Sequence, residues 1–342
     1  MLSIAFATLV TAPTLTRVGM ITGRISPKSI VHSGSGVFFA QNMMYAHDVT
    51  VYDRTFTQTG RISDKVALGA LCGGSYKGSY QGSPVECAFT SDGREAWVSN
   101  YQMYGPGFRH PGNDKADGRT RYDSSFLYRI DVPSQKVVAA VKVGSVPKFV
   151  AVTPDGQKVL ASNWASYDLS IVSAKTNLEE RRIRLGRFPR GIAVDGQSRH
   201  AYVAVMGSTS VADLDLATDK VTWIRNVGTS PRHLCLDAEG RYLYATLNGE
   251  GRVAKIDLAK RKRIAASRTG SQPRSMVLRP DGKFLYVVNY DANSFSQVRT
   301  ADMKVTRTVK VNRHPIGITY DGQAHRVWVA CYSGSILVYQ EG

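Results

Sequence analysis

Long apolar runs, helical periodicity and short catalytic motifs are all missing from this 342-residue chain. No apolar stretch approaches the ~18–20 residues that a helix needs to cross a bilayer, so we expect no transmembrane segment. No segment of ten or more residues combines helical periodicity with capping residues at both ends, which disfavours a helical protein. GxSxG, Walker, HExxH and dinucleotide-binding motifs are also absent in a suitable context, so the chemistries that they serve have no support in the sequence.

Acidic residues are scarce. The chain has 27 Asp and Glu against 44 Lys and Arg, a formal net charge of +17. A balance this far from zero favours contact with polyanions, phosphorylated ligands or an anionic surface, but it says nothing about the fold. Glycine (31) and tyrosine (17) are plentiful. Together with the missing helical signal, this composition predicts β-structure with many turns.

A unit of about 42 residues recurs along the chain, and each copy opens with a proline. After the proline come an apolar run, a turn that contains Asp-Gly or a variant, and a second apolar run, which is the pattern of a β-hairpin. Two further β-rich runs complete the unit. The last five prolines are spaced 42 residues apart, and the first two units carry extra residues. The seven prolines are Pro27, Pro84, Pro147, Pro189, Pro231, Pro273 and Pro315.

Four strands in a period of about 40 residues are typical of a β-propeller blade, and seven units predict seven blades. The segments Pro273–Asn289 and Pro147–Asn163 resemble the YVTN-type propeller repeat, with its proline, Pro-Asp-Gly turn and terminal Val-Asn or Ser-Asn. The resemblance extends from about residue 12 to the end. It implies an all-β seven-bladed propeller and indicates little about function, because propellers host unrelated activities.

Ring closure can be predicted from the ends of the chain. Only 27 residues follow Pro315, so the last blade lacks one strand. We expect the N-terminal run Leu15–Thr22 to supply it beside Ser335–Tyr339, which leaves no long unpaired edge. Residues 12–342 would then form a single domain, with the apolar residues 1–11 surplus to it. That surplus reads either as the remnant of an export leader or as a frayed end.

Basic residues gather at one position of the repeat, the residue after the proline. Five of seven are Lys or Arg, where the composition predicts about one. Because the first strand of a blade lines the central channel, we expect these side chains to meet at the channel mouth and to concentrate anions there. The alternative is a structural position whose charges are each paired locally. The five residues, called here the cationic ring, are Lys28, Lys148, Arg190, Arg232 and Arg274.

Aromatic residues follow the second strand of several units and are expected on the same face. They offer a flat surface for a ligand, whereas the asparagines beside them suit hydrogen bonds to the local backbone that end the strand. Two insertions, at 63–83 and 102–123, map to this face as well, which points to function. The aromatic candidates are Tyr101, Trp164, Tyr290 and Tyr332.

Three functions are compatible with this pattern. The first is a non-enzymatic scaffold that holds an anionic small molecule, polyanion or protein partner at the channel mouth. The second is a lactonase-like hydrolase or isomerase using Glu86, His233 and Arg274 as acid, base and anion clamp. The third is a nucleic-acid binder, supported only by net charge. We expect no metal and no cofactor, because the histidines come from separate units without ligand spacing. We expect a monomer.

The chain has only four cysteines, Cys72, Cys87, Cys235 and Cys331. Cys72 lies in the first insertion and Cys87 in the adjoining inner strand, so we predict a disulfide that would pin the intervening loop. Such a bond suits an exported bacterial protein, periplasmic or extracellular, better than a cytosolic one. Cys235 and Cys331 fall on strand positions, where small buried apolar residues are expected.

Overall fold

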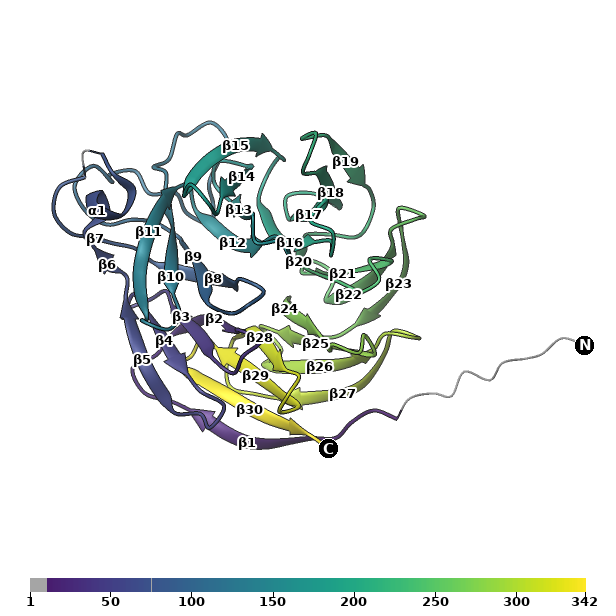
Figure 1. Ribbon diagram of the computed structural model, residues 1–342. Coiled ribbons are helices and arrows are strands. Elements are labelled where there is room, and N and C mark those ends of the chain that lie inside the picture. Colours follow the sequence, from purple (N-terminus) through teal and green to yellow (C-terminus); the bar gives the residue numbers. More distant parts are fainter. Residues whose placement is uncertain (1–10, 75) are drawn as a thin grey trace, which may run out of the picture.

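Seven four-stranded antiparallel sheets stand side by side around a common centre in the computed structural model, which describes residues 11–74 and 76–342 (Figure 1). This is an all-β seven-bladed propeller, as the repeat predicts. Among the described residues no helix is both long enough and apolar enough for a bilayer crossing. The segment predicted to be surplus, residues 1–11, lies almost entirely outside the described part of the chain.

In blades 1 to 6 the strands follow the chain from the inner to the outer edge of the sheet. The first three blades are β2(Pro27–His32) to β3(Phe38–Asn42), β4(Asp48–Tyr52) and β5(Gln58–Ser63); β8(Pro84–Phe89) to β9(Glu95–Asn100), β10(Phe126–Asp131) and β11(Lys136–Lys142); and β12(Pro147–Val152) to β13(Lys158–Asn163), β14(Asp168–Ser173) and β15(Leu178–Arg184).

Blades 4 to 6 repeat this order without insertions. They are β16(Pro189–Val194) to β17(His200–Val205), β18(Ser210–Asp215) and β19(Val221–Ile224); β20(Pro231–Leu236) to β21(Tyr242–Leu247), β22(Arg252–Asp257) and β23(Lys262–Arg268); and β24(Pro273–Leu278) to β25(Phe284–Asn289), β26(Ser294–Arg299) and β27(Lys304–Lys310).

Blade 7 is built from both ends of the chain. Its first three strands, from the channel outward, are β28(Pro315–Asp321), β29(Arg326–Cys331) and β30(Ser335–Glu341). β1(Leu15–Ile21) pairs antiparallel with β30 as the outer strand. The predicted closure is therefore confirmed, with β1 ending one residue earlier than expected. At the junction with blade 1, Phe38 stacks on Trp328 with ring centroids 4.0 Å apart, and Arg54 Nε donates to the buried Asp321 at 2.7 Å.

The repeat prolines mark the inner wall. All seven inner strands begin at the proline, and each inner strand contacts the inner strands of both neighbouring blades. In blades 3 to 7 the residue before the proline has a positive φ, between 51° and 63°. Its carbonyl accepts a hydrogen bond from the residue that follows the second strand, for example Trp164 N to Val146 O at 2.9 Å. This bond places the two loops of one blade side by side on one face.

The hairpin turns on the opposite face follow the prediction only in part. Gly93, Gly156, Gly240 and Gly282 have positive φ values, as Asp-Gly turns require. In the turns with Asp195-Gly196 and Asp321-Gly322 the left-handed residues are Ser198 (57°) and His325 (52°) instead. In these turns the glycine comes two or three positions before the left-handed residue, so it takes an ordinary conformation.

The two insertions pack against each other beside blade 2. The first contains β6(Lys65–Val66), the short helix α1(Leu68–Cys72) and β7(Tyr80–Gln81), and Gln81 pairs with Tyr104 of the second. An aromatic cluster fills the space between them; Tyr76 meets Tyr80 and Phe126 edge-on at 5.7 Å. The first insertion thus supports the second, which continues toward the centre of the propeller.

Candidate functional site

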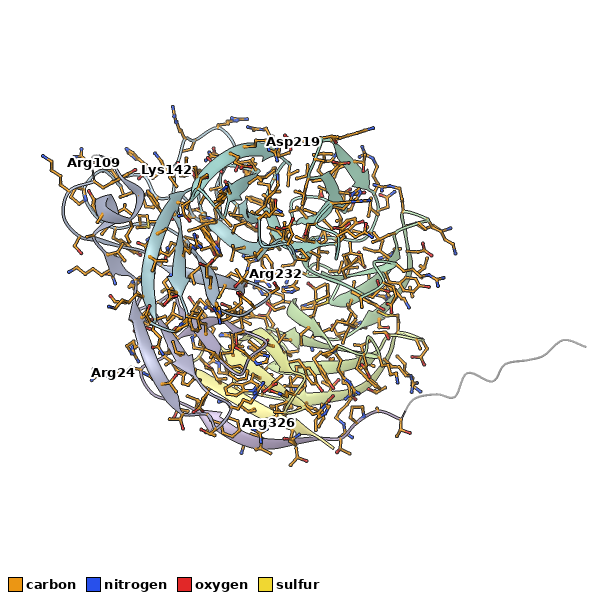
Figure 2. The ribbon with its side chains drawn as sticks, in the orientation of Figure 1. Arg24, Arg109, Lys142, Asp219, Arg232 and Arg326 are labelled. Carbon is orange, nitrogen blue, oxygen red and sulfur yellow. The ribbon has the colours of Figure 1, made fainter. Side chains whose placement is uncertain are left out.

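The cationic ring comes from the inner strands of blades 1, 3, 4, 5 and 6, and its charges act on one another. Burial first, and then the charges of Arg190, Lys148 and Arg232, hold the pKa of Lys28 well below its usual value. Burial, Arg190 and Arg274 lower the pKa of Arg232 in the same way. Figure 2 shows Arg232 near the middle of the disc, whereas Arg24 and Arg109 lie toward its rim. The five charges therefore share one central region.

Most of these cations lack a carboxylate partner. Lys148, Arg190 and Arg232 are only 7, 6 and 3% exposed. Within the described residues, Lys148 forms the only ion pair of the ring, with Asp114. Arg190 Nη1 donates to the carbonyl of Lys148 at 3.1 Å, and Arg274 Nη2 to the amide oxygen of Gln272 at 2.8 Å. The Nε of Arg274 is buried and has no hydrogen-bond partner in the described part of the chain. Buried charges are normally paired, so this arrangement costs stability.

Aromatic rings flank three of the five cations. Lys148 Nζ lies 3.9 Å from the Trp164 ring centroid, and the Arg274 guanidinium carbon lies 4.5 Å from that of Tyr290. Lys28 lies 4.9 Å from the ring of Tyr332 in blade 7. The loop hydrogen bonds described above explain the pairing, because they set residue 164 beside 146 and residue 290 beside 272. The faces of aromatic rings attract cations, so these contacts partly offset the energetic cost of burying the three charges.

Asp114, in the second insertion, is the site residue that sequence reasoning missed. It pairs with Lys148, accepts a hydrogen bond from Tyr101 Oη at 2.9 Å, and its carbonyl accepts one from the Trp164 indole at 3.3 Å. Burial opposes its ionisation, but the charge and hydrogen bond of Lys148 hold its pKa below the usual range. Nothing in the repeat predicts Asp114, since it belongs to no repeat position.

Glu86 and His233 lie one residue further along their inner strands, where the register shifts. Glu86 resumes the pairing, with Ser99, whereas His233 lies within the shift and pairing resumes at Leu234. Burial raises the pKa of Glu86 to about 7, against the opposing charges of Arg190 and Arg232. Burial and then Arg232 and Arg190 lower the pKa of His233 to about 3, so its imidazole is neutral at neutral pH. His233 packs edge-on against Phe149 of blade 3 at 5.2 Å. That contact passes over blade 4, whose equivalent residue is Gly191.

The remaining histidines of this face make separate local contacts. His47 hydrogen-bonds the Ser83 hydroxyl at 3.1 Å, and His314 stacks on Tyr290 at 4.5 Å. The His110 backbone donates to Asp123 at 2.6 Å. In residues 11–74 and 76–342 no three His, Cys, Asp or Glu side chains are placed to hold a metal ion together.

The asparagines that end the second strands are structural. Asn42, Asn163 and Asn289 are fully buried, and each amide donates to side chains of its own blade, as in Asn163 Nδ2 to Asp168 Oδ1 at 2.7 Å. The partners are mostly side chains of the third strand, where the sequence suggested backbone.

The basic run at 260–263 contrasts with the cationic ring. It lies at the turn between β22 and β23, where Lys260 pairs with Asp257 at 3.7 Å, Arg261 with Asp213 at 2.7 Å and Arg263 with Glu250 at 3.3 Å. Local carboxylates thus balance this run, as they do for ordinary surface charges.

The predicted Cys72–Cys87 disulfide is wrong, because the structure leaves both cysteines free. The Cys72 thiol donates to the Leu68 carbonyl at 3.1 Å, at the end of α1, and packs with the insertions. Cys87 is buried in a different apolar cluster, with Phe39 and Val98. The two thiols belong to separate cores, so the disulfide no longer supports export.

Comparison with known proteins identifies the fold and nothing finer. The chain matches no protein-family model and no curated protein, so the YVTN repeat type stays a resemblance. Among solved structures it is similar to the hydrazine synthase of Kuenenia stuttgartiensis, with a TM-score of 0.72 and 16% sequence identity over 93% of this chain and 96% of that one. At this identity the likeness extends to the propeller architecture alone.

Proposed function

We propose that this propeller is a non-enzymatic binding scaffold that holds an anionic ligand or partner at the channel mouth. One observation carries the proposal: five cations from five blades converge, three of them nearly buried, and only Lys148 has a carboxylate partner within the described residues. Like charges without counter-charges destabilise a fold, and a bound anion would remove that cost.

The surroundings of the ring suit recognition of oxyanions. Arginine presents parallel N–H donors that match carboxylate and phosphate oxygens, and the buried Nε of Arg274 is a donor that a ligand could satisfy. Tyr101, Trp164, Tyr290 and Tyr332 border the same region, so a ligand with a planar or apolar body gains contact area there. Low local dielectric strengthens each of these interactions.

Isothermal titration calorimetry with inorganic pyrophosphate at fixed, low ionic strength tests the proposal. We expect the double variant Arg190→Met/Arg232→Met to lose at least about tenfold in affinity, which corresponds to 1.4 kcal/mol. The matched control is Arg261→Met/Arg263→Met, which removes the same formal charge from cations that have carboxylate partners. Equal losses in both variants would indicate diffuse polyanion attraction, as in a nucleic-acid binder, and would contradict a defined site.

Lactonase-like catalysis is the second candidate, because a buried carboxyl with a pKa of about 7 beside two arginines is typical of acid–base sites. It requires a substrate position shared by Glu86 and His233, and His233 instead packs on Phe149. Glu86→Gln separates the two functions. Loss of turnover on a lactone panel with anion affinity retained would favour the enzyme, and an absence of turnover in the unmodified protein would remove it.

A further inference from the structure

Asp114 reaches the whole cationic ring from outside the repeat. Its charge acts on each of the five ring pKa values, those of Lys28, Lys148, Arg190, Arg232 and Arg274. Glu86, a second carboxylate of the site, is buried and 8% exposed, and Asp291 acts on Arg274 alone among the ring residues. The Asp114 side chain is 69% exposed while its partner Lys148 is 9% exposed. A carboxylate of the chain itself therefore stands at the entrance, on the cations that a ligand would contact.

The backbone around Asp114 is fixed independently of its carboxylate. The Trp164 indole holds the Asp114 carbonyl at 3.3 Å, and the Tyr167 hydroxyl donates to the carbonyl of Ala116 at 2.8 Å. Ala116 is 1% exposed and packs with Val146 and Trp164. Rotation of the Asp114 side chain is enough to release Lys148, because these anchors do not involve the carboxylate. No unfolding of the insertion is needed.

The charge balance of the site is unequal even with Asp114 in place. Five cations against the three carboxylates that act on them, Asp114, Glu86 and Asp291, leave a formal excess of two positive charges, and His233 is neutral. A monovalent anion that displaced Asp114 would exchange one negative charge for another and leave the excess unchanged. A tethered group also has an effective concentration of about millimolar or more, which a free monovalent competitor must exceed. Only an anion of higher charge gains from the exchange.

We propose that the ligand of the cationic ring is an oxyanion with at least two negative charges, on phosphate or carboxylate groups, and that it binds by displacing the Asp114 carboxylate from Lys148. This inference rests on the proposed function and adds to it the valence of the ligand and a competitor built into the chain. Asp114 then sets the minimum charge of the ligand: a monovalent anion does not displace its carboxylate from Lys148, whereas a multivalent anion does.

Titration of two proteins with four probes tests this inference. The probes are pyrophosphate and citrate, which are multivalent, and acetate and chloride, which are monovalent. In Asp114→Asn the amide oxygen can still accept the Tyr101 hydrogen bond, but the competing charge is gone. We expect pyrophosphate and citrate to bind this variant about three- to tenfold more tightly than the unmodified protein, since exposed carboxylates compete with roughly this strength.

Asp117→Asn is the matched control. It removes the same charge from the same insertion, and its carboxylate oxygen accepts hydrogen bonds from the backbone N–H groups of Arg119 and Thr120, which an amide oxygen can also accept. We expect affinities within about twofold of the unmodified protein. Melting curves without ligand confirm that both variants are folded, as expected for substitutions on an exposed loop.

The outcomes distinguish a failure of this inference from a failure of the proposed anion-binding function. If pyrophosphate binds and Arg190→Met/Arg232→Met abolishes binding, but Asp114→Asn leaves affinity unchanged or weaker, the site stands and the competitor role of Asp114 fails. If acetate or chloride binds as tightly as pyrophosphate, the valence argument fails. If neither the unmodified protein nor Asp114→Asn binds any probe, the proposed function itself fails. Binding of pyrophosphate to Asp114→Asn alone would support the proposed function but contradict this inference, because the unmodified protein would then not release Asp114 to a multivalent anion.

Discussion

Replacing Arg232 by methionine is expected to stabilise the protein while removing its anion affinity. Arg232 is 3% exposed, feels the charges of Arg190 and Arg274, and forms no ion pair within the described residues. Like charges 4 Å apart repel by about 4 kcal/mol at an effective dielectric constant near 20, and the repulsion falls with distance, so relief of it is worth on the order of 1–3 kcal/mol here. Attraction to Glu86 and Asp114 offsets part of this repulsion, and methionine fills most of the volume of the arginine stem. We expect a net gain of about 1–3 kcal/mol in the free energy of unfolding.

The assay is urea and thermal unfolding in a buffer without multivalent anions, where this gain raises Tm by a few degrees. Added pyrophosphate should then raise the Tm of the unmodified protein and leave that of Arg232→Met nearly unchanged. Arg54→Met is the control, and it should change the free energy of unfolding in the opposite direction. It removes the guanidinium that forms an ion pair, at 2.7 Å, with the fully buried carboxylate of Asp321. We expect it to destabilise the protein by about 1–3 kcal/mol. Destabilisation by Arg232→Met of similar size would refute the view that the ring is under repulsion.

Three further predictions follow from the same region. Burial raises the pKa of Glu86 to about 7, so the stability that this group contributes is complete below pH 4.5 and is lost as the pH rises through 7. Glu86→Gln should therefore flatten the fall in the free energy of unfolding between pH 4.5 and 7 by an amount on the order of 3 kcal/mol. Burial lowers the pKa of Lys148 to about 7, and a bound anion favours the protonated form, so the affinity for pyrophosphate should fall between pH 7 and 9. Calorimetry in buffers of different ionisation heat should show proton uptake on binding, and no uptake would contradict a role for Lys148. Gly191→Ala should cost about 2–4 kcal/mol because its Cβ would lie 2.6 Å from the Arg232 carbonyl oxygen, whereas Gly196→Ala, with no atom within 4 Å, should be nearly neutral in the same unfolding assay.

The blades could be predicted from the sequence because each repeats a local pattern. The proline, the turn and the strand-ending asparagine recur at fixed spacing, and the structure starts every inner strand at the proline. The basic position after the proline inherits this regularity, so its residues could be named in advance. The same holds for Trp164 and Tyr290, which stand 16 positions after their cations.

Asp114 and the cysteines could not be predicted in this way, because they depend on how irregular segments fold. The second insertion has no periodicity, and the path that carries Asp114 to Lys148 is set by packing of Ala116 and by hydrogen bonds from Trp164 and Tyr167. The Cys72–Cys87 pairing rested on proximity along the chain. A short helix and a separate apolar cluster place the two thiols in different surroundings.

The pairing of β1 with β30 brings the two ends of the described chain together. Thr14 N donates to the Gly342 carbonyl at 3.1 Å, and Gly342 N donates back to Thr14 at 3.3 Å. A short linker could therefore join the ends, and new ends could be opened at an exposed turn such as the one between β22 and β23, giving a circularly permuted protein with the same blades. Blade 7 would then become a continuous hairpin series like the others. In the native order β1 precedes β30 by the length of the propeller, so blade 7 can be completed only after β30 has been synthesised.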